Sequence, residues 1–180
     1  SGRVAEIRDE IIQHIGATAD EIPFIGELIR LKDDEREWES AIERILHNFA
    51  LRLIVPEKYY RKVNEYVNNH NLRGRIVYQR YNYDAALREF VNRHAQDNSL
   101  LNKIEFKPNA QYIDWIEDRL YSEFNYTCVD TLEDFNHINE KAVTKEGLIK
   151  AKGGKHEKDD RPEISRREHY VLGWDNREKI

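Results

Sequence analysis

The chain has 180 residues, 39% of them hydrophobic and 35% charged, and this length allows one sizeable domain or two small domains that share a core. Its formal net charge of −5 argues against a dedicated nucleic-acid module, although a local basic patch could still exist on an acidic protein. The single cysteine, Cys128, excludes an internal disulfide, and no apolar run approaches membrane-spanning length, so we expect a soluble protein of a reducing, cytoplasmic compartment.

Both ends of the chain carry helix signals. Apolar residues recur at three- to four-residue spacing from Val4 to Ile15, which predicts an N-terminal helix with a narrow apolar stripe. Near the other end, Asp175 and Glu178 stand at capping-box spacing and predict a helix that begins where the chain stops. Together with the absence of methionine, these helices favour a piece of a longer protein with two helical arms. Ordinary terminal helices are the alternative.

Between these ends, helical and strand patterns alternate, which predicts an α+β fold with a subdomain break near residues 96–108. In chain order, the sequence predicts an extended segment at 21–31, a helix at 35–50, a strand at 51–55, a helix at 57–71, a strand at 73–81, a helix at 85–94, a strand at 102–107, a helix after Pro108, a short strand at 126–130, a small helix at 132–138, and two short strands within 141–154 that turn at Glu146-Gly147.

The stretch from 147 to 164, GLIKAKGGKHEKDDRPEI, combines glycines, lysines and acidic residues. A phosphate-binding P-loop is excluded, because His156 stands where the motif needs a hydroxyl and no glycine lies five residues before Gly154. His156, Glu157, Asp159 and Asp160 are metal-ligand types, but they follow one another without the recurrent spacing of a coordination site. A solvated loop is favoured, and we expect no metal site.

One enzyme pattern stays open as an alternative. Asp84 followed by Glu105 and Lys107, the last two on one face of a predicted strand, imitates the D…E-x-K arrangement of metal-dependent nucleases. An exposed strand face is favoured, because E-x-K is common in a charge-rich sequence. No other catalytic motif is present, and Cys128 lies in an apolar strand typical of a small core residue. We therefore expect no catalytic residues and no cofactor in this chain.

Basic residues gather after residue 144, which leaves a DNA-binding clamp as a further alternative. The lysines that could contact DNA are Lys145, Lys150, Lys152 and Lys155. Acidic residues are interleaved through the same region, so a self-neutralised surface is at least as well supported. We expect any DNA contact to be weak and sensitive to salt.

Several short motifs follow one another in a recognisable order: Leu28-Ile29, Ala41-Ile42-Glu43, Ile54-Val55, Gly74-Arg75, Val143-Thr144, Glu146-Gly147 and Gly153-Gly154. This order resembles the hinge domain of SMC (structural maintenance of chromosomes) proteins. Two later runs, GGKHEKDDR and YVLGWDNREKI, look most like the MukB/MksB-like JetC subunits of Wadjet plasmid-defence systems. The chain differs from ordinary SMC hinges in having few glycines in the lead-in and a long insertion around residues 81–108.

The resemblance implies an SMC-hinge-like fold of two subdomains with mixed sheets and flanking helices, bounded by the ends of an antiparallel coiled coil. The implied parts are a coiled-coil arm end at 1–19, hinge subdomain I at 20–97, hinge subdomain II at 98–173 and the start of the returning helix at 174–180. It also implies that the complete protein is an ABC-type ATPase with ATP and Mg²⁺ in distant heads, and that it extrudes DNA loops with kleisin-type and nuclease subunits bound elsewhere, at the nucleoid and away from membranes.

The function implied for the chain itself is homodimerisation. The implied interface residues are Gly74, Arg75, Ile76, Val77, Tyr78, Val143, Thr144, Gly147, Ile149, Gly153 and Gly154. We expect the segment 142–154 to pair with 73–81 of a second copy, so that edge strands become interior ones. In this interpretation the glycines allow close strand approach, and the charged run after them is a connecting loop.

Overall fold

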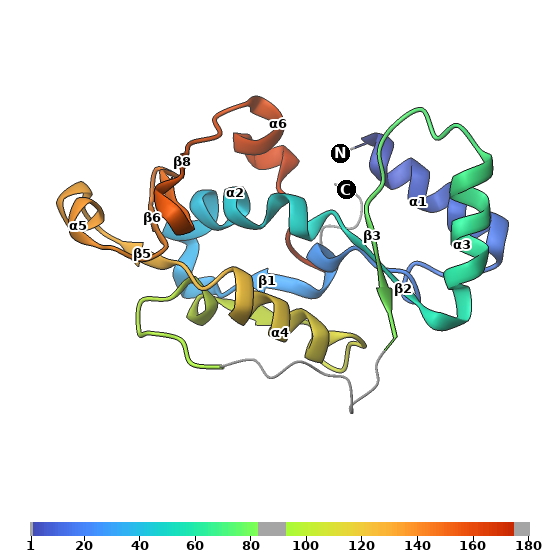
Figure 1. Ribbon diagram of the computed structural model, residues 1–180, viewed down its shortest axis with the longest axis horizontal. Helices are drawn as coiled ribbons and strands as arrows, with labels where there is room; N and C mark the ends of the chain where they lie inside the picture. The colour runs from blue at the N-terminus through green and yellow to red at the C-terminus, as the bar shows by residue number, and fades with distance from the viewer. Residues whose placement is uncertain (1, 83–92, 175–180) are drawn as a thin grey trace.

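The computed structural model describes residues 2–82 and 93–174, in which helices alternate with short strands (Figure 1). The α-helices are α1 (Gly2–Ile15), α2 (Glu39–Ala50), α3 (Glu57–Asn69), α4 (Ile113–Glu123), α5 (Leu132–His137) and α6 (Pro162–Ser165). The 3-10 turns are η1 (Ile25–Leu28), η2 (Asp33–Trp38), η4 (Leu100–Asn102), η5 (Lys152–Gly154) and η6 (Arg167–His169). Most of the predicted helix at 85–94 lies outside the described residues, as do Asp175 and Glu178.

The strands form three small sheets. They are β1 (Ile29–Leu31), β2 (Leu53–Pro56), β3 (Tyr78–Tyr81), β4 (Ile104–Phe106), β5 (Thr127–Val129), β6 (Ala142–Thr144), β7 (Ile149–Lys150) and β8 (His156–Glu157). β1 pairs with β4 antiparallel, and β2 pairs with β3 in parallel. The largest sheet has the order β5-β6-β7-β8, with a parallel first pair and two antiparallel pairs after it. The predicted α+β class with mixed sheets is confirmed.

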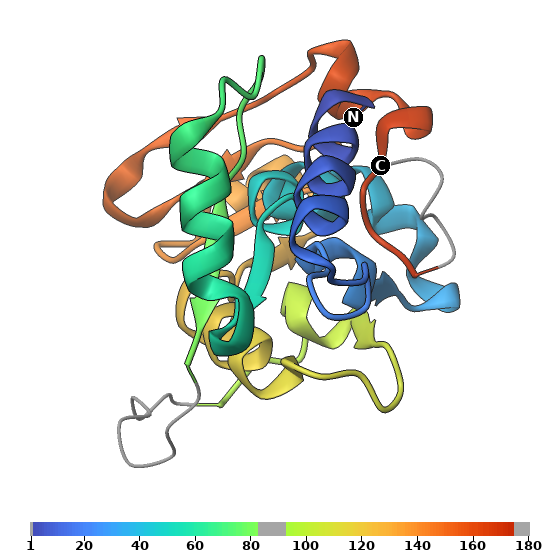
Figure 2. The ribbon, with the colours of Figure 1, turned by 90° about the vertical axis from the view of Figure 1, so that its right-hand side faces the viewer.

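The buried apolar side chains divide into two main cores and a smaller one. The larger core joins the apolar face of α2 to β1, β4, α4 and the four-stranded sheet, and its fully buried members include Ile25, Ile29, Ile42, Leu46, Leu100 and Ile116. The second core lies between α1, α3 and β2, and Figure 2 shows α1 and α3 running alongside one another. Residues 25–50 thus pack with the second half of the chain. The subdomain limits at 20–97 and 98–173 stay a prediction.

Three local predictions need correction. Within 21–31 the chain forms the 3-10 turn η1 before it extends into β1. Within 73–81 only Tyr78–Tyr81 is a strand. The run after the glycine pair is not only a connecting loop, because His156–Glu157 returns as strand β8 against β7. Sequence patterning misses β8 because both of its side chains are exposed, so that no apolar alternation marks it.

No helix in the ranges 2–82 and 93–174 has both the length and the apolar character needed to cross a membrane.

Candidate dimer interface and chain-end junction

The first candidate interface segment ends in a strand with one unpaired edge. The Val77 carbonyl accepts a hydrogen bond from Leu53 N at 2.9 Å, so the backbone groups of Val77 face β2. Because backbone groups alternate in direction along a strand, those of Tyr78 and Arg80 face away from β2. Among the described residues no strand covers that outer side of β3. It is therefore available for pairing with another chain.

The residues before β3 contact the N-terminal helix. Gly74 and Arg75 are exposed, and a Cβ on Gly74 would lie 3.0 Å from both Arg3 Cγ and Ile7 Cδ1 of α1. Ile76 is half-buried against the core between α1 and α3. The N-terminal end of β3 therefore lies directly beside α1.

The second candidate segment lies mostly inside the chain's own fold. Val143 is 0% exposed and Ile149 is 5% exposed, and Thr144 is also buried. β6 lies between β5 and β7, and β7 lies between β6 and β8, so neither has an unpaired edge. The expectation that 142–154 supplies an edge strand is wrong for β6 and β7, because β8 already occupies the outer position. The edge available to a second copy is that of β8.

The glycines of this segment allow backbone conformations with positive φ. Gly147 has φ +94°, and a Cβ there would lie 2.5 Å from Arg44 Cδ, so the turn between β6 and β7 needs glycine for both reasons. Gly153 and Gly154 have φ values of +82° and +83° and no atoms within 4 Å of a Cβ position. They make the turn that carries the chain from β7 into β8, which is closed by Ala151 N donating to Lys155 O at 2.7 Å.

The outer edge of β8 is exposed. The Lys155 carbonyl faces β7, so alternation turns the backbone groups of His156 away from the sheet. Figure 1 shows β8 and β3 well apart along the longest axis of the molecule. In the described chain, β3 and β8 are therefore two well-separated strands that each have an edge without a partner strand.

The four candidate DNA-binding lysines differ in their availability. Lys145 lies between two carboxylates, Glu37 at 3.2 Å and Asp130 at 3.5 Å, and its pKa is raised chiefly by the hydrogen bond to Glu37. Lys150 donates to the carbonyls of Phe135 and Ile138 at the end of α5, at 2.6 and 2.9 Å. Lys152 and Lys155 are exposed beside the glycine turn. Only these last two keep the accessibility that a phosphate contact requires.

Of the alternative nuclease residues, Glu105 and Lys107 lie in the described part of the chain. Glu105 is engaged by Arg30 across the β1–β4 pair, with Arg30 Nε donating to Glu105 Oε1 at 2.7 Å. Asp84 lies outside the described residues. Within the described residues no three His, Cys, Asp or Glu side chains are grouped to hold a metal.

Cys128 is buried in β5, as predicted for a core residue. Burial raises the pKa of its thiol to about 12, which keeps it protonated at neutral pH. The protonated thiol is a poor nucleophile.

A junction that the sequence patterns did not predict joins the two ends of the described chain at η1. On one side, Arg8 of α1 forms a bidentate, buried ion pair with Glu27, whose Oε1 also accepts from Phe24 N at 2.9 Å. On the other side, Gly173 N donates to Gly26 O at 2.8 Å. The signal that could have revealed Glu27 is a carboxylate within the apolar run 22–31, where burial demands a partner.

A second buried carboxylate fixes the C-terminal segment to α2. Glu43 is 4% exposed, and its two oxygens accept from Val171 N at 2.8 Å and Leu172 N at 3.2 Å. Burial raises the pKa of Glu43 to about 7; the two amide hydrogen bonds lower it by less, and the nearby Glu39 raises it slightly further. Glu43 lies on the apolar face of α2, and a carboxylate at such a position is again a sequence signal that could have revealed a buried, hydrogen-bonded side chain.

Stability should therefore depend on pH through Glu43. Its folded-state pKa of about 7 lies above its ordinary value of 4.5, so the folded state binds the proton more tightly between these pH values. The contribution of Glu43 to stability is therefore greatest at and below pH 4.5, falls as the pH rises toward 7, and is constant above that pH. We expect wild type to lose about 2 kcal/mol relative to Glu43→Gln between pH 5.5 and 7.5, measured by urea denaturation. An unchanged difference between the two proteins across this range would contradict the raised pKa.

No protein-family model matches the sequence, and no curated protein matches it. Solved structures do match. The hinge domain of the Pyrococcus furiosus SMC protein is similar at 23% identity and a TM-score of 0.60, over 91% of this chain and 88% of that chain. A structure of the same hinge with an extended coiled coil matches at 22% identity and a TM-score of 0.58, over 87% of this chain and 56% of that one.

Two further structures show the same likeness. An asymmetric dimer of the Geobacillus stearothermophilus SMC hinge domain matches at 19% identity and a TM-score of 0.51, over 89% of this chain and 73% of that chain. A chain from the folded elbow of cohesin matches at 17% identity and a TM-score of 0.60; 89% of this chain spans only 23% of that one. The chain therefore has the mixed α+β fold of SMC hinge domains and corresponds to a minor part of the cohesin chain.

Proposed function

We propose that this chain is the homodimerisation hinge of an SMC-like, condensin-type ATPase subunit, and that it holds two coiled-coil arms together without catalysing a reaction itself. The observation that carries this proposal is the pair of strand edges, β3 and β8, that have no partner in the described chain. Unpaired backbone edges favour association, and no further strand pairs with these two edges among the described residues. The similar hinge domain of the G. stearothermophilus SMC protein forms an asymmetric dimer, which supports the same function.

The positions of the two edges support a twofold arrangement. If β3 of one copy pairs with β8 of the other, symmetry produces the same contact a second time, so one dimer contains two such pairings. The outward backbone groups of Tyr78 and Arg80 on β3 and of His156 on β8 are those that face this pairing, in which a strand amide would replace the 3.2 Å hydrogen bond from Gln79 Nε2 to the Arg80 carbonyl. Gly153 and Gly154, with open space around them, leave room for the second chain to approach.

For the complete protein, we propose ATP and Mg²⁺ sites in separate heads, action on DNA by loop extrusion, and kleisin-type and nuclease subunits bound outside this chain. The resemblance of GGKHEKDDR and YVLGWDNREKI to JetC-type subunits favours plasmid defence, and chromosome organisation is the second candidate. Direct DNA contact by this chain would rest on Lys152 and Lys155 and is expected to be weak, because the surrounding surface carries many acidic residues.

Sedimentation equilibrium over a wide concentration range tests the dimer and the β3 edge together. We expect wild type to reach twice the monomer mass of 21.5 kDa. Arg80→Pro removes an outward N–H while leaving the backbone groups that face β2, so we expect the dissociation constant to rise at least tenfold, because the contact is lost twice per dimer.

Arg80→Ala is the matched control. It removes the exposed ion pair between Arg80 and Glu57, in which Arg80 Nε lies 2.8 Å from Glu57 Oε2, but it keeps the outward amide. Exposed pairs contribute little, so we expect this variant to dimerise within about threefold of wild type. A wild-type chain that remains monomeric at every concentration would refute the proposed function, and equal weakening by both variants would refute the role of the β3 edge.

A further inference from the structure

Strand β8 has few contacts of its own to hold it in place. It pairs with β7 over two residue pairs only, Ile149↔Glu157 and Lys150↔His156, and both of its side chains are exposed. The His156 ring approaches Phe135 edge-on, with centroids 5.9 Å apart. Such a strand is fixed mainly by what holds the chain on either side of it.

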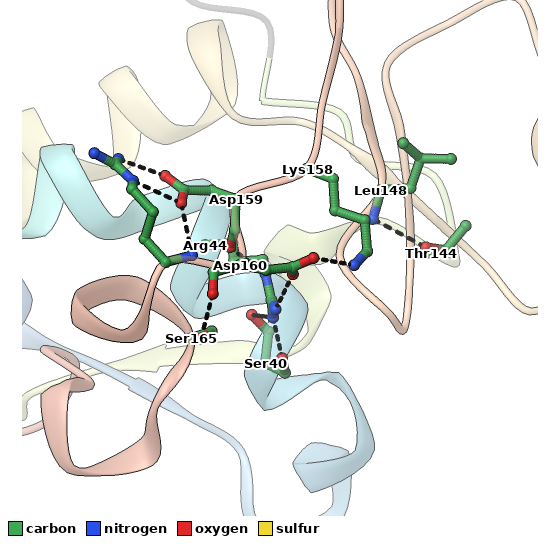
Figure 3. Close-up of polar contacts among 9 residues, drawn as sticks. Ser40, Arg44, Thr144, Leu148, Lys158, Asp159, Asp160 and Ser165 are labelled. Carbon is green, nitrogen blue, oxygen red and sulfur yellow. Dashed lines mark hydrogen bonds and ion pairs between the residues drawn. The ribbon is translucent and has the colours of Figure 1, made fainter.

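On the N-terminal side, the glycine turn fixes β8 through the bond from Ala151 N to Lys155 O. On the C-terminal side, an arginine of α2 binds the loop that follows β8. Arg44 Nε donates to Asp159 O at 2.9 Å, and an Arg44 terminal nitrogen donates to Asp160 Oδ1 at 2.8 Å (Figure 3). The segment that follows β8 is thereby attached to the helix at the centre of the larger core.

The Arg44 side chain is itself held rigidly. It is 7% exposed, its remaining terminal nitrogen donates to Ser40 Oγ and to Ser40 O, and its stem passes over Gly147, where a Cβ would come within 2.5 Å of it. An arginine fork has several donors in one plane, so it can bind the Asp159 carbonyl, the Asp160 carboxylate and Ser40 at once. A lysine has a single ammonium group and cannot reproduce this arrangement.

We propose that Arg44 is the positioning residue that sets the β8 edge for pairing with a second copy of this chain. This inference rests on the proposed function. In this proposal Arg44 makes no contact with the second copy. It binds residues 159 and 160 to α2, so that β8 stays paired with β7 and its outer edge faces the second copy. Gly147 belongs to the same arrangement, because only glycine leaves the space through which the aliphatic part of the Arg44 side chain reaches the loop.

The test compares three variants by sedimentation equilibrium and by hydrogen exchange of the intact chain. Arg44→Met keeps most of the buried stem but removes the fork. We expect it to raise the dimer dissociation constant at least tenfold and to speed exchange of the Ala151 amide, which is bonded across the base of the β7–β8 turn. Arg44→Lys should restore only part of the affinity. Arg161→Ala is the matched control, because Arg161 binds the Asp159 side chain at 2.6 and 2.9 Å within the loop itself and does not tie the loop to α2 through these bonds.

Asp160→Ala keeps the inference testable if Arg44→Met fails to fold. Asp160 is exposed, so its loss should leave the cores intact while it removes one of the two anchors of the loop. We expect a smaller loss of affinity in the same direction. Dimerisation of both Arg44→Met and Asp160→Ala at wild-type strength would overturn the role of Arg44 and leave the proposed function standing. A monomeric wild type would overturn the proposed function, and faster Ala151 exchange in Arg44→Met would then still show that Arg44 anchors β8.

Discussion

Replacing Glu27 with alanine is expected to lower the free energy of unfolding by about 3–5 kcal/mol. Arg8 and Glu27 are only 4% and 2% exposed, and the substitution leaves a buried guanidinium without its counter-charge. Among the described residues the Arg8 Nε has no hydrogen-bond partner, so the charge depends on Glu27. Phe24 N also loses its acceptor. Urea denaturation followed by circular dichroism measures the loss.

The matched control replaces both members of the ion pair. The double variant Arg8→Met with Glu27→Leu fills the same space with apolar side chains, and such replacements of a buried pair are often neutral or stabilising. We expect it to be much more stable than the single Glu27→Ala variant, although Phe24 N still lacks its acceptor. A single variant that loses less than about 1 kcal/mol would show that water reaches the Arg8 charge.

Gly26→Ala is expected to lower the free energy of unfolding by about 3 kcal/mol, at the upper end of the usual cost of overpacking. A Cβ at this position would lie 2.5 Å from Val171 O and 2.9 Å from Ala50 Cβ. Neither neighbour can move alone, because Ala50 ends α2 and the amide of Val171 is bonded to Glu43. The thermal midpoint and the urea midpoint should both fall.

Gly74→Ala provides the comparison for this steric effect. Its added Cβ would meet side-chain atoms and no backbone atom among its nearest neighbours, which are Arg3 Cγ and Ile7 Cδ1 at 3.0 Å and Arg3 Nε at 3.7 Å. We therefore expect a loss below about 1 kcal/mol. If the two alanine variants were equally stable, close packing at η1 would not be what requires glycine at residue 26.

The strongly patterned elements could be predicted from the sequence. α2 and β2 were predicted because apolar residues repeat with the period of a buried helix face and then form a continuous run, and both end close to the predicted limits. α3, α4 and β5 follow for the same reason. In each of these elements, the spacing of apolar residues within the element itself indicates which face is buried.

The candidate interface was harder to predict because it depends on which strands lie at the sheet edges. Val143 and Ile149 have the apolar pattern of strands that could be buried either inside one chain or between two chains, and local sequence does not distinguish these cases. The deciding neighbour is β8, which is formed by exposed His156 and Glu157 and held in part by Arg44, more than a hundred residues earlier in the chain. Such a long-range contact leaves no periodic signal.

The η1 turn is one point at which tension on the two ends of the described chain would meet. A pull on α1 reaches the turn through the Arg8–Glu27 pair, and a pull on the C-terminal segment reaches it through the bond from Gly173 to Gly26. Force applied at the two ends would therefore act on the same short turn from opposite sides. The residues before β3 also contact α1 through Gly74, beside Arg3 and Ile7, so tension on α1 reaches the strand edge that is proposed to pair with a second copy.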